Sequence, residues 1–210
     1  MTGTAPVRRI VTSGIFSLDG QDFEVDNNVW LVGDDTDVVV VDAAHDAAAV
    51  LAAVGDRRLR AVLCTHGHND HINAAVEVAG AAGAQVFLHP ADRMLWDAVH
   101  PADPPQPLAD GDRVEVAGTV LHVLHTPGHS PGSVCLHAPD LGVVLSGDTL
   151  FRGGPGATGR SFSSFPLIVD SIRTRLLTLP GHTRVLTGHG EETTIEAEAV
   201  DYDAWVARGH

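Results

Sequence analysis

Residues 65–71, which read THGHNDH, are the most informative part of this sequence. This block contains three histidines and one aspartate within six residues: His66, His68, Asp70 and His71. Imidazole nitrogens and carboxylate oxygens are ligands that suit zinc and neighbouring first-row metals. The apolar run RAVLCT at 60–65 leads directly into the block, so we expect it in a loop at the end of a buried strand. Since one ion cannot easily take four donors from so short a loop, the block predicts two ions completed by other segments.

Three later segments provide such donors. In each one an apolar, strand-like run is followed by a glycine and then by the candidate ligand, which is His129, Asp148 or His189. The glycine gives the backbone conformational freedom close to the ions. Other histidines do not share this pattern and are interpreted as ordinary structural residues: His45, His89, His100, His122, His125, His137, His182 and His210.

The first half of the chain alternates between strand-like and helix-like runs. Strands are expected at 7–16, 27–32, 37–42, 60–65 and 84–89, and helices at 47–54, 73–82 and 91–99. Asp46 and Asn73 are suitable N-caps for the first two helices. Such alternation is typical of strand–helix units and of a partly parallel sheet.

The second half begins differently, with short strands joined by tight turns. These runs, at 112–118, 119–126, 133–139 and 142–148, favour antiparallel pairing. After a glycine-rich loop at 151–160, the sequence predicts a helix at 167–179, a strand at 184–187 and a last helix starting near Thr193 or Thr194. The expected fold is therefore α/β, a four-layer αββα sandwich with two mixed sheets, and a single domain over residues 1–210.

Composition limits the partners of this domain. The formal net charge is −14, from 13 basic and 27 acidic residues, which disfavours binding to nucleic acid or to an anionic membrane surface. No apolar run approaches the ~20 residues that span a bilayer. No apolar segment follows Arg8 and Arg9 as in a signal peptide, so the cytoplasm is the expected location. Cys64 and Cys135 form no CxxC pair and are expected to be buried thiols.

Five features occur in order along the chain, and together they resemble the metallo-β-lactamase superfamily: Asp42 after DVVVV, the HGHNDH block, His129, Asp148 and His189. The resemblance implies that His66, His68 and His129 hold one metal, that Asp70, His71 and His189 hold the other, and that Asp148 bridges them. It also implies that Asp42 orients the metal-binding loop through hydrogen bonds. The alternative for Asp42 is a turn residue at the end of its strand.

Within the superfamily, the segments TPGHSPGSVCL, LSGDTLF and TGHGEETTI are most similar to glyoxalase II-like thioesterases of the short, single-domain type. The resemblance implies hydrolysis of a thioester, an acyl conjugate of a small thiol, by a metal-bound hydroxide that Asp70 orients. Two departures leave the carrier thiol open, with a mycothiol-type conjugate as one candidate. The chain has no counterpart of the C-terminal helical extension that binds glutathione in glyoxalase II. Residues 159–162 read GRSF where many short relatives have Gly-Arg-Thr-Asp.

Arg152 and Arg160 lie in the loop that follows Asp148, where each is either a ligand for an anionic part of the substrate or an ion-paired surface residue. The cofactor expected from the ligand types is a pair of divalent ions, zinc first, with iron and manganese as alternatives. The substrate is expected to be a small molecule, and the sequence carries no signal for an oligomeric state.

Three other functions are compatible with parts of this pattern. Persulfide dioxygenases resemble the chain in its TPGH and GD segments but bind one iron through two histidines and an aspartate. A lactonase or another ester hydrolase would use the same two metals. A non-enzymatic binding module would be expected to have lost ligands, whereas all seven positions are intact here.

Overall fold

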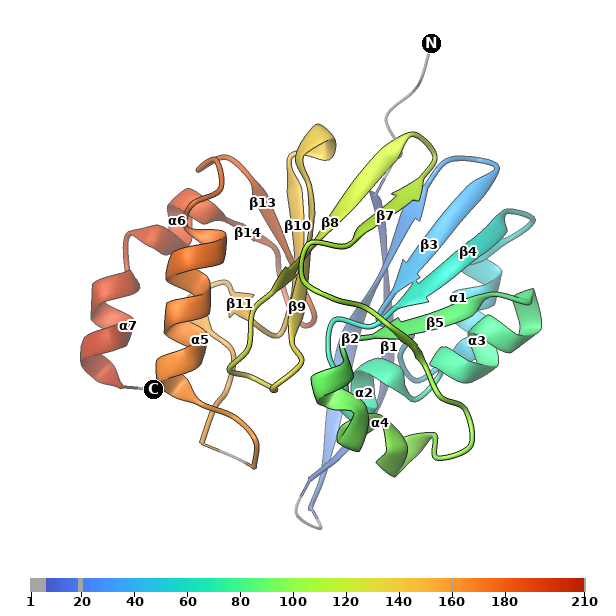
Figure 1. Ribbon diagram of the computed structural model, residues 1–210, viewed down its shortest axis with the longest axis horizontal. Helices are drawn as coiled ribbons and strands as arrows, with labels where there is room; N and C mark the ends of the chain where they lie inside the picture. The colour runs from blue at the N-terminus through green and yellow to red at the C-terminus, as the bar shows by residue number, and fades with distance from the viewer. Residues whose placement is uncertain (1–6, 19–20, 160, 210) are drawn as a thin grey trace.

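The computed structural model describes residues 7–18, 21–159 and 161–209. Two mixed β-sheets pack face to face, and helices cover the outer face of each sheet (Figure 1). This arrangement is the four-layer αββα sandwich expected from the sequence. No helix in the described part of the chain is long and apolar enough to cross a membrane.

The first sheet holds six strands in sequence order and carries the first half of the chain. Its first three strands are antiparallel neighbours and the rest pair in parallel, as the strand–helix alternation predicts. The strands are β1 (Val7–Leu18), β2 (Gln21–Gly33), β3 (Asp37–Val41), β4 (Arg58–Leu63), β5 (Gln85–Leu88) and β6 (Gln106–Pro107). The helices of this half are α1 (Ala47–Val54), α2 (Asn69–Ile72), α3 (Ala75–Ala82) and α4 (Arg93–Val99), with a 3-10 turn at Pro90–Asp92.

The second sheet has the strand order β14-β13-β10-β9-β8-β7. Its strands β7 to β10 form an antiparallel meander, as expected, and β13 joins β10 in parallel. The strands are β7 (Arg113–Val116), β8 (Thr119–His125), β9 (Val134–Ala138), β10 (Val143–Gly147), β13 (Arg184–Thr187) and β14 (Thr193–Thr194). A small ribbon of β11 (Leu150–Phe151) and β12 (Gly154–Pro155) follows β10. The helices are α5 (Phe165–Ser171), α6 (Ile195–Ala199) and α7 (Tyr202–Arg208), with a 3-10 turn at Pro139–Leu141.

The alternation of side chains along β3 shows how the layers are held together. Val38 and Val40 pack in the core beneath the helices of the first half, while Val39 and Val41 pack in the core between the two sheets. Successive side chains of a strand point to opposite faces, so a strand buried on both faces must be apolar throughout. A third core joins the second sheet to α5, α6 and α7.

Of the two residues predicted to cap helices in the first half, Asp46 does so and Asn73 does not. Asp46 caps α1, because its side chain accepts a hydrogen bond from the backbone N–H of Ala49, 2.9 Å away. The helix expected at 73–82 starts later, at Ala75, and the short helix α2 precedes it. Asn73 does not cap it, since its Oδ1 accepts instead from the backbone N–H of His45 at 2.6 Å.

The remaining helices also differ in detail from the expectation. The segment expected to be helical at 91–99 opens with a 3-10 turn before α4, and the one expected at 167–179 starts two residues earlier as α5 and continues as a π-helical turn, Ile172–Leu176. The final helix expected to start near Thr193 or Thr194 is divided into two, α6 and α7. The first, α6, starts after Thr194, whose hydroxyl accepts from the N–H of Ala197 at 3.2 Å. The first expected strands, 7–16 and 27–32, are longer and pair as one hairpin, β1–β2.

Candidate metal centre

Every predicted ligand follows a strand at the same edge of the sandwich. His66 and His68 lie in the loop after β4, and Asp70 and His71 lie in α2, which continues from that loop. The other three follow strands of the second sheet: His129 follows β8, Asp148 follows β10 and His189 follows β13. The carboxyl ends of these strands meet where the two sheets face each other, so both sheets contribute to the site.

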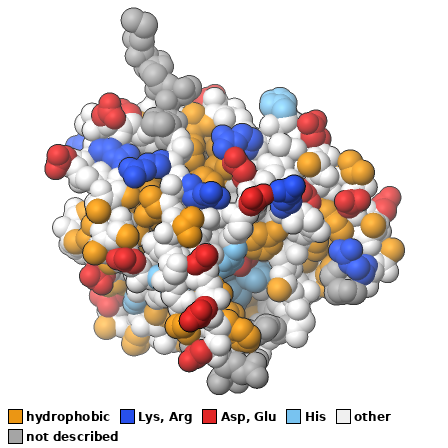
Figure 2. Space-filling model, turned by 180° about the vertical axis from the view of Figure 1, so that it is seen from behind, with side chains coloured by type: hydrophobic (Ala, Val, Ile, Leu, Met, Phe, Trp, Pro, Cys, Tyr) orange, Lys and Arg blue, Asp and Glu red, His pale blue; other side chains and the backbone are white. Residues whose placement is uncertain are grey.

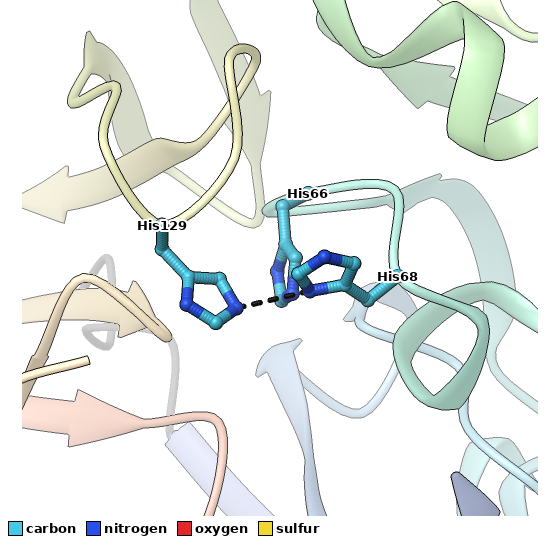
Figure 3. A group of neighbouring side chains, drawn as sticks. All are labelled: His66, His68 and His129. Atoms are coloured by element: carbon cyan, nitrogen blue, oxygen red, sulfur yellow. Dashed lines mark hydrogen bonds between the residues drawn. The ribbon is translucent and has the colours of Figure 1, made fainter. Parts of the chain in front are cut away.

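The first group comprises His66, His68 and His129. One ring nitrogen from each lies within 4.8 Å of the others, and the three rings point toward one another (Figure 3). Nδ1 of His68 and Nε2 of His129 are 3.0 Å apart. Three imidazoles that converge in this way are a common ligand set for zinc.

The second group comprises Asp70, His71 and His189, whose donor atoms also lie within 4.8 Å of one another. The Nε2 atoms of His71 and His189 are 3.1 Å apart, and Oδ2 of Asp70 lies 3.3 Å from Nε2 of His189. Asp70 and His71 are buried, and His189 is partly exposed.

Asp148 lies between the two groups. Its Oδ1 is 3.4 Å from Nε2 of His71, and its Oδ2 is 3.5 Å from Nε2 of both His129 and His189. The carboxylate therefore touches one histidine of the first group and two of the second. This is the position from which one side chain can bridge two ions.

Several polar atoms of the site have no ordinary partner. Nε2 of His66 and Oδ1 of Asp148 are buried without a hydrogen bond of good geometry. Buried polar atoms are nearly always satisfied, so each such exception requires an explanation. Bound cations would supply the missing partners, and the donor set of five imidazoles and two carboxylates suits divalent first-row metals.

The ionisation of the site also favours a bound cation. Burial opposes the charged form of Asp148, yet the neighbouring His71 and His189 lower the pKa of this carboxyl well below its usual range. In the same way Asp70 has its pKa lowered to about 2, against the effect of burial, by His71 and His189. The two carboxylates in turn raise the pKa of His189 to about 10 although burial acts in the opposite direction. Two carboxylates thus stay ionised. Without an ion, protons on His71 and His189 balance them, and divalent ions bound at the same place would replace those protons.

Hydrogen bonds on the far side of the rings fix which nitrogen faces the site. Nδ1 of His129 donates to the carbonyl of Ala157 at 2.9 Å, and Nδ1 of His189 donates to the carbonyl of Asp26 at 2.8 Å. Each bond places the proton on Nδ1, so the lone pair of Nε2 is directed at the candidate ions. Partners of this kind orient metal-ligating histidines and set their tautomer.

Asp42 serves His71 in the same way. Its Oδ2 lies 3.0 Å from Nδ1 of His71 and also accepts from the hydroxyl of Thr65 at 2.7 Å, while its Oδ1 accepts from the backbone N–H of Thr65 at 2.7 Å. Asp42, His66 and His71 also satisfy a purely geometric criterion for a metal group. We favour the orienting role, because both oxygens of Asp42 already accept hydrogen bonds.

Sequence reasoning missed a second layer of support, which comes from β2. Asn27 is fully buried, and its Nδ2 donates to Oδ2 of Asp70 at 3.2 Å. Its Oδ1 in turn lies 2.8 Å from Nε2 of His45, a histidine interpreted as merely structural. The available signal was the polar pair Asn27 and Asn28 within β2, directly before its apolar run VWLV.

A cavity of about 180 Å³ opens onto the site. Five predicted ligands line it together with the following five residues: Phe16, Val25, Ala157, Ser161 and Ser163. On the face of the molecule drawn in Figure 2, histidine side chains are visible near the centre, next to hydrophobic ones. Arg152 is not among the described residues that line the cavity; it is exposed and ion-paired with Glu191. Arg160 lies outside the described residues.

Comparison with known proteins agrees with this geometry. The family model of the metallo-beta-lactamase superfamily matches residues 23–189. The chain belongs to this superfamily. The match runs from β2 to His189 and so contains all seven predicted ligands, and it confirms the resemblance drawn from the sequence.

Two relatives within the superfamily are named as hydrolases. The probable metallo-hydrolase YqgX of Bacillus subtilis is 35% identical over 187 residues, which cover 82% of this chain and 88% of that protein. A hydroxyacylglutathione hydrolase of Pseudomonas paraeruginosa is 38% identical over 171 residues, which cover 78% of this chain and 62% of that protein. The crystal structure of TTHA1623 in a di-iron-bound form superposes with a TM-score of 0.75 and 34% identity, covering 83% of this chain and 93% of that one.

Proposed function

We propose that this protein is a binuclear metallohydrolase that cleaves the thioester of a small acyl–thiol conjugate. The observation that carries the proposal is Asp148, which lies between two groups of three ligands and reaches one histidine of the first and two of the second. A centre with a single ion would not need the second group. The di-iron form of TTHA1623 and the hydroxyacylglutathione hydrolase support the metal count and the reaction class respectively.

When bound, two divalent ions polarise a carbonyl and lower the pKa of water toward neutrality. The residues of this chain have the remaining tasks. Asp70 is ionised, lines the cavity and is held through Oδ2 by Asn27, so its carboxylate can accept a hydrogen bond from the attacking water and orient it. No serine or cysteine of a nucleophilic triad is needed, and both cysteines are buried.

The cavity favours a small acyl group. Its volume of about 180 Å³ is below the ~300–1,000 Å³ of typical ligand pockets, so the carrier of the conjugate must lie outside it. Phe16 and Val25 of the hairpin supply apolar lining, and Ser161 and Ser163 add polar lining from the loop before α5. None of the described lining residues is an arginine, so an acyl group without charge fits best. Of the two arginines expected to bind an anionic part of the substrate, Arg152 is paired with Glu191. Arg160 therefore remains the candidate for this role.

One sample tests the metal count and the reaction together. The purified protein is analysed for metals and assayed with acetyl and lactoyl thioesters of glutathione and of a mycothiol analogue, before and after chelation. We expect close to two ions per chain and thioester hydrolysis that is lost on chelation and restored by added metal. One iron per chain with oxygen consumption on a persulfide would instead identify a dioxygenase. Hydrolysis of acyl-homoserine lactones in place of thioesters would identify a lactonase.

Asp70→Asn tests the proposed role of Asp70, with turnover expressed per bound ion because Asp70 is also a candidate ligand. The amide keeps the shape of the side chain but is a weaker acceptor, so we expect turnover to fall by about 10²–10⁴-fold, the usual contribution of a positioned acid–base group. The assay is run at saturating zinc, because loss of a carboxylate ligand is also expected to weaken binding of the second ion. Wild-type turnover in this variant would show that another group orients the water.

A further inference from the structure

Asp92 is a fully buried carboxylate that the proposed reaction does not use. It closes the 3-10 turn before α4, and no ion pair is formed by it among the described residues. Burying a carboxylate without a cation is costly unless hydrogen bonds satisfy it. Three hydrogen-bond donors satisfy the carboxylate of Asp92, and their positions indicate its role.

All of the side-chain partners of Asp92 belong to two loops that carry metal ligands. Oδ2 accepts from the backbone N–H of Gly67 at 2.8 Å and from the hydroxyl of Ser130 at 2.6 Å. Oδ1 accepts from the backbone N–H of Gly132 at 2.5 Å. Gly67 lies between His66 and His68, and Ser130 directly follows His129.

The two loops come from different sheets. The loop of His66 and His68 follows β4 of the first sheet, and the loop of His129 joins β8 to β9 of the second. Figure 3 shows that their imidazoles converge from separate segments of chain. The carboxylate of Asp92, which is not drawn there, accepts hydrogen bonds from both segments. The spacing between His68 and His129 therefore depends on a contact that no metal supplies.

The space around Asp92 allows little adjustment. A Cβ built on Gly132 would lie 2.7 Å from Cγ of Asp92, and one built on Gly67 would lie 3.1 Å from its Cβ. The backbone of both loops therefore packs directly against the carboxylate. A longer side chain such as glutamate would not fit without moving a ligand loop.

We propose that Asp92 is a positioning residue, which fastens the His66–His68 loop to the His129 loop and so preforms the first of the two metal sites. This inference rests on the proposed metal centre. It assigns Asp92 to one site only, because the residues of the second group have other partners. Asp70 accepts from Asn27, while His71 donates to Asp42 and His189 donates to the carbonyl of Asp26.

Asp92→Asn tests the proposal, because the amide keeps the volume but has only one acceptor oxygen for three donors. Zinc alone is titrated into the metal-free protein against a chromophoric chelator, which resolves the two equivalents. We expect affinity for one equivalent to fall by about 10–100-fold, as is usual for outer partners of metal ligands, and the other to stay unchanged. Since Asp92 touches neither ion nor substrate, saturating zinc is expected to restore thioester turnover.

Asp97→Asn is the matched control. Asp97 lies on the same stretch of chain but is exposed and pairs with Arg93, so both zinc affinities are expected to equal those of the wild type. Wild-type affinity for both equivalents in folded Asp92→Asn would overturn the inference. An equal loss at both sites would also overturn it, since that indicates a general structural role.

Ser130→Ala provides the same test if Asp92→Asn does not fold. It removes one of the three hydrogen bonds and leaves the buried carboxylate with the other two. We expect a smaller loss, again limited to one equivalent, and unchanged affinity would overturn the inference. Failure of the wild-type protein to bind two zinc ions would instead overturn the proposed centre, which is a different result.

Discussion

Oδ2 of Asp42 lies 3.0 Å from Nδ1 of His71, and both side chains are buried at the candidate metal centre. The same carboxylate accepts two hydrogen bonds from Thr65, the residue before the HGHNDH block. One side chain therefore fixes both the start of the ligand loop and the ring of a ligand within it. Its own backbone has a positive φ of 56°, a conformation that aspartate and asparagine tolerate better than most residues.

We expect Asp42→Asn to fold but to bind the second metal more weakly. Asparagine tolerates the positive φ, but its amide offers one acceptor oxygen where three donors now converge. The affinity for one zinc equivalent should fall by about 10–100-fold, which the chelator titration measures. Asp46→Ala serves as the control, because it removes the cap of α1. It should cost about 1 kcal/mol of folding free energy and leave both affinities unchanged.

Gly188→Ala should disrupt the metal centre directly. A Cβ at this position would lie 2.2 Å from Oδ1 of Asp148 and 2.7 Å from Cε1 of His71, so these two ligands would have to move. We expect loss of metal from the purified protein and loss of thioester turnover. Gly80→Ala, in the middle of α3 with open space around it, should instead raise the free energy of unfolding by about 0.5–1 kcal/mol. Full metal content in Gly188→Ala would contradict the proposed ligand geometry.

Phe16→Ala should change the acyl specificity. Phe16 lines the cavity, and its ring centroid lies 6.0 Å from that of His68. Replacing its ring by a methyl group therefore enlarges the cavity on its apolar side. We expect the ratio of kcat/KM for a bulky over a small acyl thioester to rise by about tenfold or more. Ile15→Ala, at the neighbouring and exposed position of the hairpin, should leave this ratio unchanged. An unchanged ratio in Phe16→Ala would place the acyl group elsewhere.

The thiol of Cys135 should make the protein less stable in alkali. Burial raises the pKa of this thiol to about 11, against smaller opposing effects from Thr126, Thr149 and Arg175. Because the folded pKa is raised, the stabilisation is complete below the unfolded pKa of about 8.5 and is lost as the pH rises toward the folded value. Between pH 7 and pH 10 we expect a loss of about 1–2 kcal/mol in the free energy of unfolding, measured in urea.

Cys135→Ala isolates that contribution, since the alanine variant should lose less stability over the same pH interval. Thiol labelling provides an independent check. The thiolate is the reactive species, so native protein at pH 8 should resist a thiol reagent that labels Cys135 rapidly after unfolding. Equal pH dependence in wild type and variant would mean that other groups control the alkaline transition.

The sequence predicted the candidate ligands from two local signatures. One is the dense HGHNDH block, and the other is a histidine or aspartate that follows an apolar run and a glycine, as at His129, Asp148 and His189. Both can be recognised without knowledge of the fold, and all seven candidate residues lie together in the structure. The caps Asp46 and Thr194 were likewise predictable, since capping involves residues only a few positions apart.

The supporting residues could not be found in the same way. Asp92 resembles any acidic residue near the start of a helix, and its partners lie 25 to 40 positions away in other loops. Asn73 looked like a cap, but the backbone of His45, which is distant in sequence, takes its side chain instead. Such roles depend on tertiary contacts, which one sequence does not encode in a local pattern.

The position of the centre between the sheets has a consequence for refolding. Each proposed ion takes two ligands from the first half of the chain and two from the second when the bridging Asp148 is counted, so neither half can coordinate an ion fully by itself. A metal ion whose visible absorption depends on its ligands, such as cobalt(II), would therefore develop its native absorption only after the two halves have docked. The rate at which this absorption appears would report on the last step of assembly, the docking of the two halves. It would thereby distinguish that step from the formation of each sheet.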